Sequence, residues 1–307
     1  MKKLLSGAVV AALLLTACGG GAVAATVGQT ELTVDQVQAF PYSTDGAIPA
    51  DQFARYLGAL IQWQILDDAA KTEFDIDPTS DEVDSELNDL LAAQAGGLPV
   101  DQVAQQQNVS VDILHRLARV SLIQKLIVDQ FAQQAPEPTS AEVAQAMSDA
   151  ADGLTNICVR HLLVDTEEAA KEAKQRIEEG EDFATVAKDV STDPTVADNG
   201  GDLGCAQAQK YVPEFAQAAV GADLNTVIGP VQSQFGYHVL EVYDRTPPDP
   251  TDLPTEDEIK DQLRQEKGAS QLQDWLVEKV DNADVTVNAE YGTWTTDPTP
   301  QVQPPTS

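Results

Sequence analysis

Two of the three histidines in this 307-residue chain lie in apolar runs that are far apart in the sequence. His161 sits in NICVRHLLVD, which begins at Asn156, and His238 sits in GYHVLEVYDR, which ends at Arg245. Both runs are rich in β-branched, leucine and aromatic residues, a pattern typical of buried strands. Because a buried imidazole must find a polar partner, we expect a sheet to bring the two rings together. Such a pair can set the hydrogen bonding and the charge beside a reacting group.

The residues between these runs predict one α/β unit. We expect strands at Asn156–Val164, Val227–Val231 and Gly236–Asp244, and helices at Thr166–Glu179, Asp182–Val190 and Pro213–Val220. The loop STDPTVADNGGDLG follows the second helix, and its glycine pair permits a tight turn into Asp202–Gly204. The third histidine, His115, lies in the helical run ILHRLARV, and we expect it to be structural or exposed.

Five short motifs follow one another along this unit. They are RHLLV around His161, S-x-D-P at Ser191–Pro194, GGDLG at Gly200–Gly204, VPEF at Val212–Phe215 and QFGYHV around His238. In their order and spacing they resemble the motifs of parvulin-type peptidyl-prolyl cis/trans isomerases, and the resemblance covers residues 155–245. It implies an α+β fold in which a small antiparallel sheet is wrapped by helices.

The resemblance also implies which residues work in the site. His161, Asp193 and His238 match the catalytic positions of the family. The matching substrate-binding positions are Leu203, Tyr211, Phe215 and Phe235. This chain departs from the family pattern at Tyr211, where a methionine is usual, and at Ala206, where a large aromatic residue is usual. These two departures bear on substrate preference and rate.

The implied reaction explains why these residue types are present. Rotation about a peptide bond has a barrier of about 18–20 kcal/mol, and only X–Pro bonds keep a substantial cis population. The twisted transition state has lost its amide resonance and is less polar than either ground state, so an apolar pocket favours it. Such catalysis is differential binding without a covalent bond, and it implies no cofactor and no metal. The alternative is that the histidines only brace the core.

The N-terminus predicts export and attachment to a membrane. Residues 1–17 have a basic start and an apolar run too short to anchor the chain, as in a signal peptide. The run closes with LTAC, which resembles a bacterial lipobox and implies lipidation of Cys18, with residues 18–25 as a flexible tether. An ordinary secretory signal is the alternative. Either reading places the protein outside the cytoplasm, and the first anchors it to the cell membrane.

The two remaining cysteines, Cys158 and Cys205, lie beside the predicted strands. In an oxidising compartment, with Cys18 lipidated, we expect them to form a disulfide. Two independent buried thiols are the alternative. A metal site is the weaker interpretation, because no ligand pair has a recognised zinc spacing.

The charge of the chain restricts its partners. With 50 acidic and 18 basic residues the net charge is −32, so we expect no binding to nucleic acid or to an anionic membrane surface. The sequence also has no G-x-S-x-G elbow, no P-loop and no dinucleotide-binding glycine pattern.

The rest of the chain predicts a second domain. Residues 26–150 read as a series of amphipathic helices, and the opening VAATVGQTEL resembles the start of the SurA and PrsA class of extracytoplasmic foldases, which implies an all-α chaperone domain. The segment Pro-Thr-x-x-Glu occurs three times as a helix-start signal. A helix and a strand within residues 255–290 are expected to complete this domain by pairing with the opening hairpin. Residues 295–307 are expected to be a disordered tail.

Two functions remain open at this point. The first is a peptidyl-prolyl isomerase that assists the folding of secreted proteins containing X–Pro bonds. The second is a holdase chaperone whose parvulin-like unit is weak or inactive, with unfolded clients held by the helical domain; its motivation is Tyr211 and Ala206. A solute-binding lipoprotein is a weaker alternative, because only one small sheet is predicted. Whether the chain is a monomer or a dimer is left open.

Overall fold

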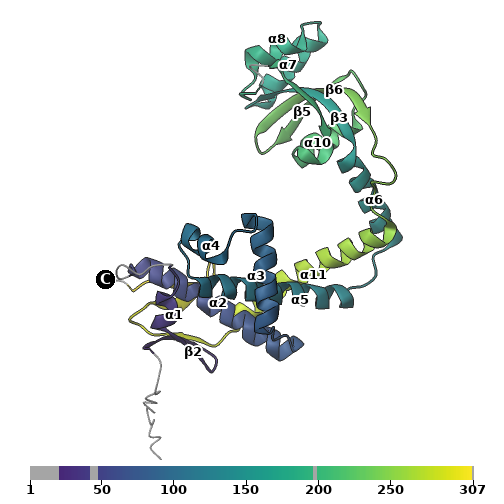
Figure 1. The fold of residues 1–307 in the computed structure, drawn as a ribbon. Helices are drawn as coiled ribbons and strands as arrows, with labels where there is room; N and C mark the ends of the chain where they lie inside the picture. The colour runs from purple at the N-terminus through teal and green to yellow at the C-terminus, as the bar shows by residue number, and fades with distance from the viewer. Residues whose placement is uncertain (1–20, 42–47, 196–198, 306–307) are drawn as a thin grey trace, which may run out of the picture. The chain divides into compact units, whose positions relative to one another are not determined.

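The computed structural model describes residues 21–41, 48–195 and 199–305 (Figure 1). The predicted signal peptide and the predicted lipid site at Cys18 lie outside these described residues. The chain divides into two compact units: the first comprises Met1–Ala135 and Gln265–Ser307, and the second comprises Pro136–Arg264. Within the described ranges, none of the helices combines the length and the apolar character needed to cross a bilayer.

The second unit is built around one antiparallel sheet of four strands in the order β4-β3-β6-β5. Its strands are β3 (Asn156–Val164), β4 (Asp202–Gln207), β5 (Val227–Ser233) and β6 (Gly236–Thr246). Its helices are α6 (Ser140–Leu154), α7 (Glu167–Glu178), α8 (Phe183–Val190), the short 3₁₀ turn η1 (Ala208–Lys210) and α10 (Pro213–Gly221).

Helices cover both faces of this sheet (Figure 1). On one face Leu162, Val164 and Val239 form a buried cluster with residues of α7 and α8. On the other face Leu240 and Phe215 belong to a second buried cluster, which α10 covers. Because successive side chains of a strand point to opposite faces, two covered faces require an unbroken apolar run. The runs around both histidines meet this requirement.

Local signals in the sequence start the helices of this unit. Thr166 caps α7 by accepting a hydrogen bond from Ala169 N, and Asp182 caps α8 by accepting one from Thr185 N. Pro213 occupies the first position of α10, where its fixed φ suits the helix and no backbone donor is needed. These ends set where each helix meets the sheet.

The first unit is a helical layer with a small sheet. Its helices are α1 (Val34–Gln38), α2 (Ala50–Phe74), α3 (Ser80–Ala95), α4 (Val100–Gln107), α5 (Val111–Gln134) and the greater part of α11 (Glu256–Asp281). Its strands are β1 (Val23–Val27), β2 (Thr30–Thr33), β7 (Val285–Val287), β8 (Thr293–Thr295) and β9 (Gln301–Gln303). The sheet β2-β1-β7 is antiparallel, so the C-terminal segment returns to the opening hairpin.

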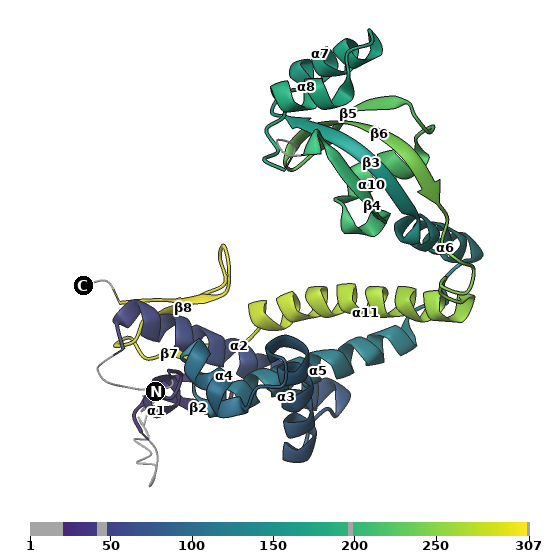
Figure 2. The same cartoon turned by 45° about the horizontal axis from the view of Figure 1, so that its top comes forward.

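Helix α11 packs closely along α5 (Figure 2). At the contact stands Gly268, where a Cβ atom would lie only 2.6 Å from the carbonyl oxygen of Val128. Further along α11, Trp275 Nε1 donates to Glu73 Oε2 at 2.8 Å, and Lys279 Nζ lies 2.7 Å from the other oxygen of Glu73. A close backbone approach and one charged network therefore join the C-terminal helix to α5 and α2.

The repeated Pro-Thr-x-x-Glu segments form capping boxes at three helix starts. These boxes begin α3, α6 and α11, at Thr79, Thr139 and Thr255. In each box the threonine hydroxyl accepts the backbone N–H of the glutamate three residues later. The carboxylate of that glutamate in turn accepts the backbone N–H of the threonine. Three separate helices share this signal, and no repeat architecture follows from it.

The prediction of a disordered tail at residues 295–307 is wrong for its described part. Strands β8 and β9 pair as a hairpin, and Val302 is buried against α2, where Gly58 leaves room for the backbone of β9. Gln62 Nε2 donates to the carbonyl of Pro300 at 3.2 Å. The Pro- and Thr-rich composition has few apolar residues, but Val302 and Trp294 suffice because α2 offers them a surface. Composition alone cannot detect such a docking surface.

Helix α6 also differs from the expected organisation. Residues 26–150 were expected to form one helical domain, whereas α6 belongs to the second unit. Its C-terminal end is tied to η1: Ala208 N donates to Thr155 O at 2.9 Å, and a Cβ atom at Gly153 would lie 3.6 Å from Cβ of Gln209. Contacts between residues so far apart in sequence do not appear in a local helix pattern.

Candidate active site

The sheet places the two strand histidines side by side. In the register of β3 and β6, His161 pairs with Leu240 and Leu163 pairs with His238, so both imidazoles project from the same face. Each residue is only 5% exposed. Their Nδ1 atoms are 3.4 Å apart, and the rings are stacked with a centroid distance of 5.7 Å. The third histidine, His115, is instead on α5 in the first unit, with Nε2 3.2 Å from Asp84 Oδ1.

Asp193 joins the histidine pair. Its Oδ2 lies 3.0 Å from His161 Nε2. The two atoms form a close electrostatic contact that is not aligned as a hydrogen bond. The other oxygen, Oδ1, accepts hydrogen bonds from the backbone N–H and the hydroxyl of Thr195, at 2.9 and 2.8 Å. The carboxylate is therefore fixed beside one imidazole.

Two hydroxyl residues hold the loop that carries Asp193 against β3. Ser191 Oγ accepts from the backbone N–H of Leu163 at 3.1 Å and from that of Asp193 at 3.3 Å. Thr192 donates its N–H and its hydroxyl to the carbonyl of Leu163, at 2.7 and 3.1 Å. The S-x-D-P motif pointed to this segment, but the sequence did not reveal that its hydroxyls position the aspartate.

Glycine is required where the same loop turns back. Gly201 has a φ of +89°, and a Cβ atom there would lie 2.2 Å from the carbonyl oxygen of His161. The carbonyl of Gly201 accepts the backbone N–H of His161 at 2.8 Å. The GGDLG motif therefore brings the backbone of the loop directly against the strand residue that carries the first imidazole.

A serine at the end of β5 completes the network, and none of the sequence motifs points to it. Ser233 Oγ lies 2.8 Å from His238 Nε2 and accepts the backbone N–H of Phe235 at 3.1 Å. The sequence does place the hydroxyl of Ser233 at the end of one hairpin strand and His238 near the start of the next strand. That signal is meaningful only when the hairpin pairing is known.

The ionised carboxylate determines one consistent set of proton positions, assigned from the network. His161 carries its proton on Nε2, facing Asp193. Its Nδ1 then accepts from Nδ1–H of His238. Nε2 of His238 accepts from the hydroxyl of Ser233, whose oxygen accepts the Phe235 N–H. Each hydrogen bond in this network donates in the direction of Asp193, the carboxylate meets His161 electrostatically, and both imidazoles are neutral.

The electrostatic surroundings agree with neutral rings. Burial, and then the neighbouring His161, lower the pKa of His238 to about 4. Burial also lowers the pKa of His161, against the opposing attraction of Asp193. Partial burial pushes the pKa of Asp193 upward, but the bonds from Thr195 and the nearby His161 hold it below its usual range. At neutral pH the site contains one carboxylate and two uncharged imidazoles.

Apolar residues flank the histidines. The ring of Phe215 is almost fully buried and stands nearly perpendicular to both imidazoles, with centroid distances of 5.7 Å to His161 and 5.4 Å to His238. Tyr211 packs on Phe215 at 5.0 Å, and Leu203 is a half-buried member of the same cluster. We call Leu203, Tyr211 and Phe215 the apolar wall.

Phe235, the fourth expected substrate-binding residue, is not part of the apolar wall. Its side chain is 60% exposed at the turn between β5 and β6. It follows Ser233 closely and lies beside the network only through its backbone N–H. The structure therefore brings together His161, Asp193, His238 and the apolar wall, and leaves the Phe235 ring in solvent.

The expected cysteine pair is joined near this site. Cys158 of β3 and Cys205 of β4 are register partners, and a disulfide links them. Strand β4 lies at the edge of the sheet in the described ranges, next to β3, and it carries Leu203 of the apolar wall. The disulfide therefore fastens the edge strand to the sheet.

Comparison with known proteins gives relatives for this arrangement. The PPIC-type PPIase (rotamase) domain family matches residues 161–244. A foldase protein PrsA from Oceanobacillus iheyensis is 30% identical over 216 residues, which is 67% of this chain and 70% of that protein. A foldase protein PrsA from Halalkalibacterium halodurans is 29% identical over 234 residues, 75% of this chain and 68% of that protein. A chaperone SurA from Pseudomonas syringae is 39% identical over 138 residues, 42% of this chain and 32% of that protein.

Among solved structures, the peptidylprolyl isomerase PrsA from Bacillus anthracis covers 73% of this chain and 97% of its own, with 22% identity and a TM-score of 0.46. The sequence relatives extend over most of the chain, through both units, and the domain match includes both histidines of the site. The chain therefore belongs to the PrsA family of foldases and is a peptidyl-prolyl isomerase, with its PPIC-type domain at residues 161–244.

Proposed function

We propose that the chain catalyses X–Pro isomerisation in secreted polypeptides at the outer face of the cytoplasmic membrane, with His161, Asp193, His238 and the apolar wall as its site. The observation that carries this assignment is the position of Phe215, whose ring stands nearly perpendicular to both imidazoles and belongs to the buried apolar cluster. Segments from β3, β6, α10 and the loop before β4 converge there.

The barrier for the reaction is about 18–20 kcal/mol, and it reflects the loss of amide resonance. The planar ground states are more polar than the twisted state, so an environment of low polarity favours the twisted state. In our proposal Leu203, Tyr211 and Phe215 seat the pyrrolidine ring and provide that environment. Catalysis then consists of tighter binding of the twisted bond, and no covalent bond forms.

The neutral state of the imidazoles fits this scheme. A charged imidazolium beside the carbonyl would stabilise the polar planar amide more than the twisted one. Burial keeps the pKa of His238 at about 4, so the ring stands in the site without a full charge. In our proposal Asp193 is a positioning residue, because it sets the proton of His161 and, through it, the proton of His238.

Location and clients are part of the proposal. The basic start, the short apolar run and the LTAC segment ending at Cys18 support export and lipid attachment. Relatives named as foldases support polypeptide clients. Growth with a labelled fatty acid tests the anchor: the label should enter the wild-type protein and not the Cys18→Ser variant, and equal labelling of both would contradict it.

The function is tested by cis/trans exchange of a proline peptide with the full-length mature chain. Wild type should accelerate the exchange, and His161→Ala should lose most of the acceleration. His115→Ala is the matched control, because this histidine lies on α5 in the first unit. Circular dichroism checks that each variant is folded. Equal rates for His161→Ala and wild type would contradict the proposed site.

A second candidate role is a holdase in which isomerisation is secondary. Ala206 favours it, because this half-buried position of β4 has a small side chain where the family has a large aromatic residue. Suppression of client aggregation by the His161→Ala variant separates the two roles. Full protection without isomerisation supports a holdase, and parallel loss of both activities contradicts it.

A further inference from the structure

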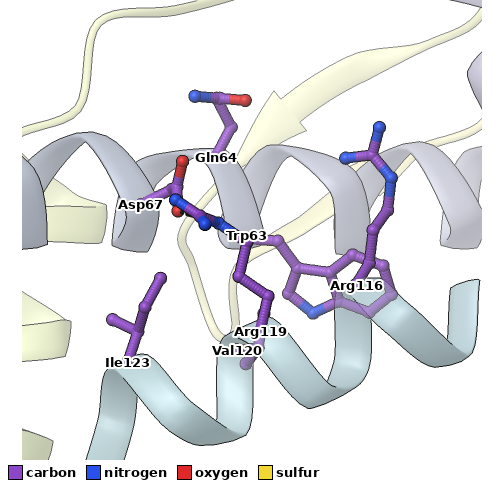
Figure 3. Close-up of a pocket in the computed structure, with 7 residues that line it drawn as sticks. All are labelled: Trp63, Gln64, Asp67, Arg116, Arg119, Val120 and Ile123. Atoms are coloured by element: carbon purple, nitrogen blue, oxygen red, sulfur yellow. Dashed lines mark hydrogen bonds and ion pairs between the residues drawn. The ribbon is translucent and has the colours of Figure 1, made fainter. Parts of the chain in front are cut away.

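A small pocket in the first unit has an unusual combination of side chains. It lies between α2 and α5 (Figure 3). The residues that line it are Trp63, Gln64 and Asp67 from α2, and Arg116, Arg119, Val120 and Ile123 from α5. Its empty volume is about 340 Å³, including the part open to solvent.

One of the two arginines, Arg119, is already paired with carboxylates. Arg119 donates from Nε to Asp67 Oδ1 at 2.8 Å, from Nη2 to Asp77 Oδ1 at 2.8 Å and from Nη1 to the carbonyl of Pro78 at 2.6 Å. Figure 3 draws its side chain extending toward Asp67. This network joins α2 and α5, and it also neutralises the one carboxylate that lines the pocket. Arg119 is therefore held by three contacts, and its charge is already balanced by Asp67 and Asp77.

The other arginine has no partner in the described part of the chain. Arg116 makes no hydrogen bond and no ion pair there, although Asp112 lies one helical turn earlier on α5. In a protein with 50 acidic and 18 basic side chains, most cations have a carboxylate within reach. Two lysines in the described ranges, Lys188 and Lys210, also lack a partner, but both are exposed to solvent, whereas Arg116 is half-buried in a pocket.

The surroundings of Arg116 are apolar on two sides. Trp63 stacks on Phe40 with a centroid distance of 5.6 Å, which fixes the indole as a wall of the pocket. Val120 and Ile123 add apolar surface from α5. An unpaired guanidinium beside such surface complements a carboxylate on a short apolar stem, because the planar donor pairs with both carboxylate oxygens and the indole covers the stem.

We propose that this pocket binds a carboxylate of a client polypeptide, through Arg116 and against Trp63. The two sources of this group are the C-terminal carboxylate and the side chain of an aspartate or glutamate. The inference rests on the proposed function only in taking unfolded polypeptides as the ligands. It gives the helical unit a favourable contact with carboxylate groups, which the net charge of −32 would otherwise repel.

The test is the binding of labelled peptides without proline to the full-length mature chain, followed by fluorescence anisotropy. One peptide sequence is prepared with either a free or an amidated C-terminus. Each of these two forms is made once with an internal glutamate and once with a glutamine in its place. The form carrying the recognised carboxylate should bind about tenfold more tightly than its neutral counterpart, as expected for a hydrogen-bonded ion pair. A preference for the free terminus identifies chain ends as the source, and a preference for glutamate identifies side chains.

Variants assign the effect to the pocket. Arg116→Gln should abolish the preference, and Arg116→Lys should retain part of it, because lysine keeps the charge without the planar donor. Arg55→Gln is the matched control on α2, since Arg55 is exposed and paired with Asp51. Unfolding temperatures verify that each variant is folded. The inference is overturned if charged and neutral peptides bind equally, if none binds, or if Arg116→Gln keeps the preference.

These outcomes are independent of the proposed function. Peptides without proline cannot report isomerisation, so their failure to bind while proline peptides are isomerised would reject the pocket alone. Carboxylate-dependent binding without any isomerisation would reject the proposed function alone.

Discussion

Ser233 Oγ lies 2.8 Å from His238 Nε2, and this contact closes the chain of hydrogen bonds that runs through both histidines. The same oxygen accepts the backbone N–H of Phe235. A single hydroxyl therefore fixes one imidazole and the tight turn between β5 and β6. Its removal should affect both the rate and the stability.

We predict that Ser233→Ala lowers the isomerisation rate and costs about 1–3 kcal/mol of unfolding free energy, because the buried ring nitrogen loses its partner. Urea unfolding and the proline-peptide assay measure the two effects. Ser233→Thr keeps the hydroxyl and serves as the control, so it should retain most of the activity. An alanine variant with wild-type rate and stability would show that this bond contributes nothing.

Much of the second unit could be predicted from the sequence. The apolar runs around His161 and His238 gave the central strands β3 and β6, because a strand covered on both faces must be apolar throughout. Helices α7 and α8 lie within a residue of the ranges expected, since Thr166 and Asp182 are strong caps. The resemblance to a known family supplied the grouping of the site residues, which no local pattern contains.

The remaining features depend on contacts between distant residues. Ser233 became recognisable only when the hairpin register placed it beside His238. The hairpin of β8 and β9 was missed because Val302 is stabilised by a surface of α2. The unpaired state of Arg116 is likewise a property of the packed helices, since Asp112 at helical spacing suggests an ion pair that does not form.

The stability of the second unit should fall in acid. Burial holds the pKa of His238 at about 4, below its usual 6.5, so the unfolded chain takes up a proton before the folded one. The stabilisation is fully present above pH 6.5 and is lost as the pH falls toward 4. Asp193, whose pKa is also lowered, acts in the same direction at still lower pH.

Urea unfolding at a series of pH values measures this effect. Wild type should lose free energy of unfolding between pH 6.5 and 4, and His238→Gln should show a shallower dependence over the same range. The isomerisation rate should stay level above pH 6.5 and fall as the pH approaches 4. Identical pH dependence of the variant and wild type would contradict a buried, neutral His238.

The disulfide between Cys158 and Cys205 closes a loop with a sequence separation of 47 residues. Replacing both cysteines by serine should therefore lower the unfolding free energy by about 2–4 kcal/mol. A reductant should destabilise wild type by a similar amount and leave the double variant unchanged. If the reductant has no effect on wild type, the bond does not stabilise the sheet edge.

Gly268 tests the packing of α11 on α5. In a solvated helix, glycine to alanine stabilises by about 1 kcal/mol. Here a Cβ atom would lie 2.6 Å from Val128 O, so we predict that Gly268→Ala lowers the unfolding temperature. Ser270→Ala, at an exposed position of the same helix, should leave it unchanged or raise it. An increase for Gly268→Ala equal to that of the control would mean that the two helices do not pack this closely.

In our proposal an apolar wall beside two neutral imidazoles isomerises X–Pro bonds. The most direct test is to follow the cis/trans exchange of a proline peptide by NMR in the presence of the full-length mature chain. Phe215 contacts both rings, so Phe215→Ala should lose most of the acceleration while the chain remains folded. Phe235→Ala, at an exposed position outside the wall, should retain most of it. A folded Phe215→Ala protein that catalyses the exchange as fast as wild type would contradict the account.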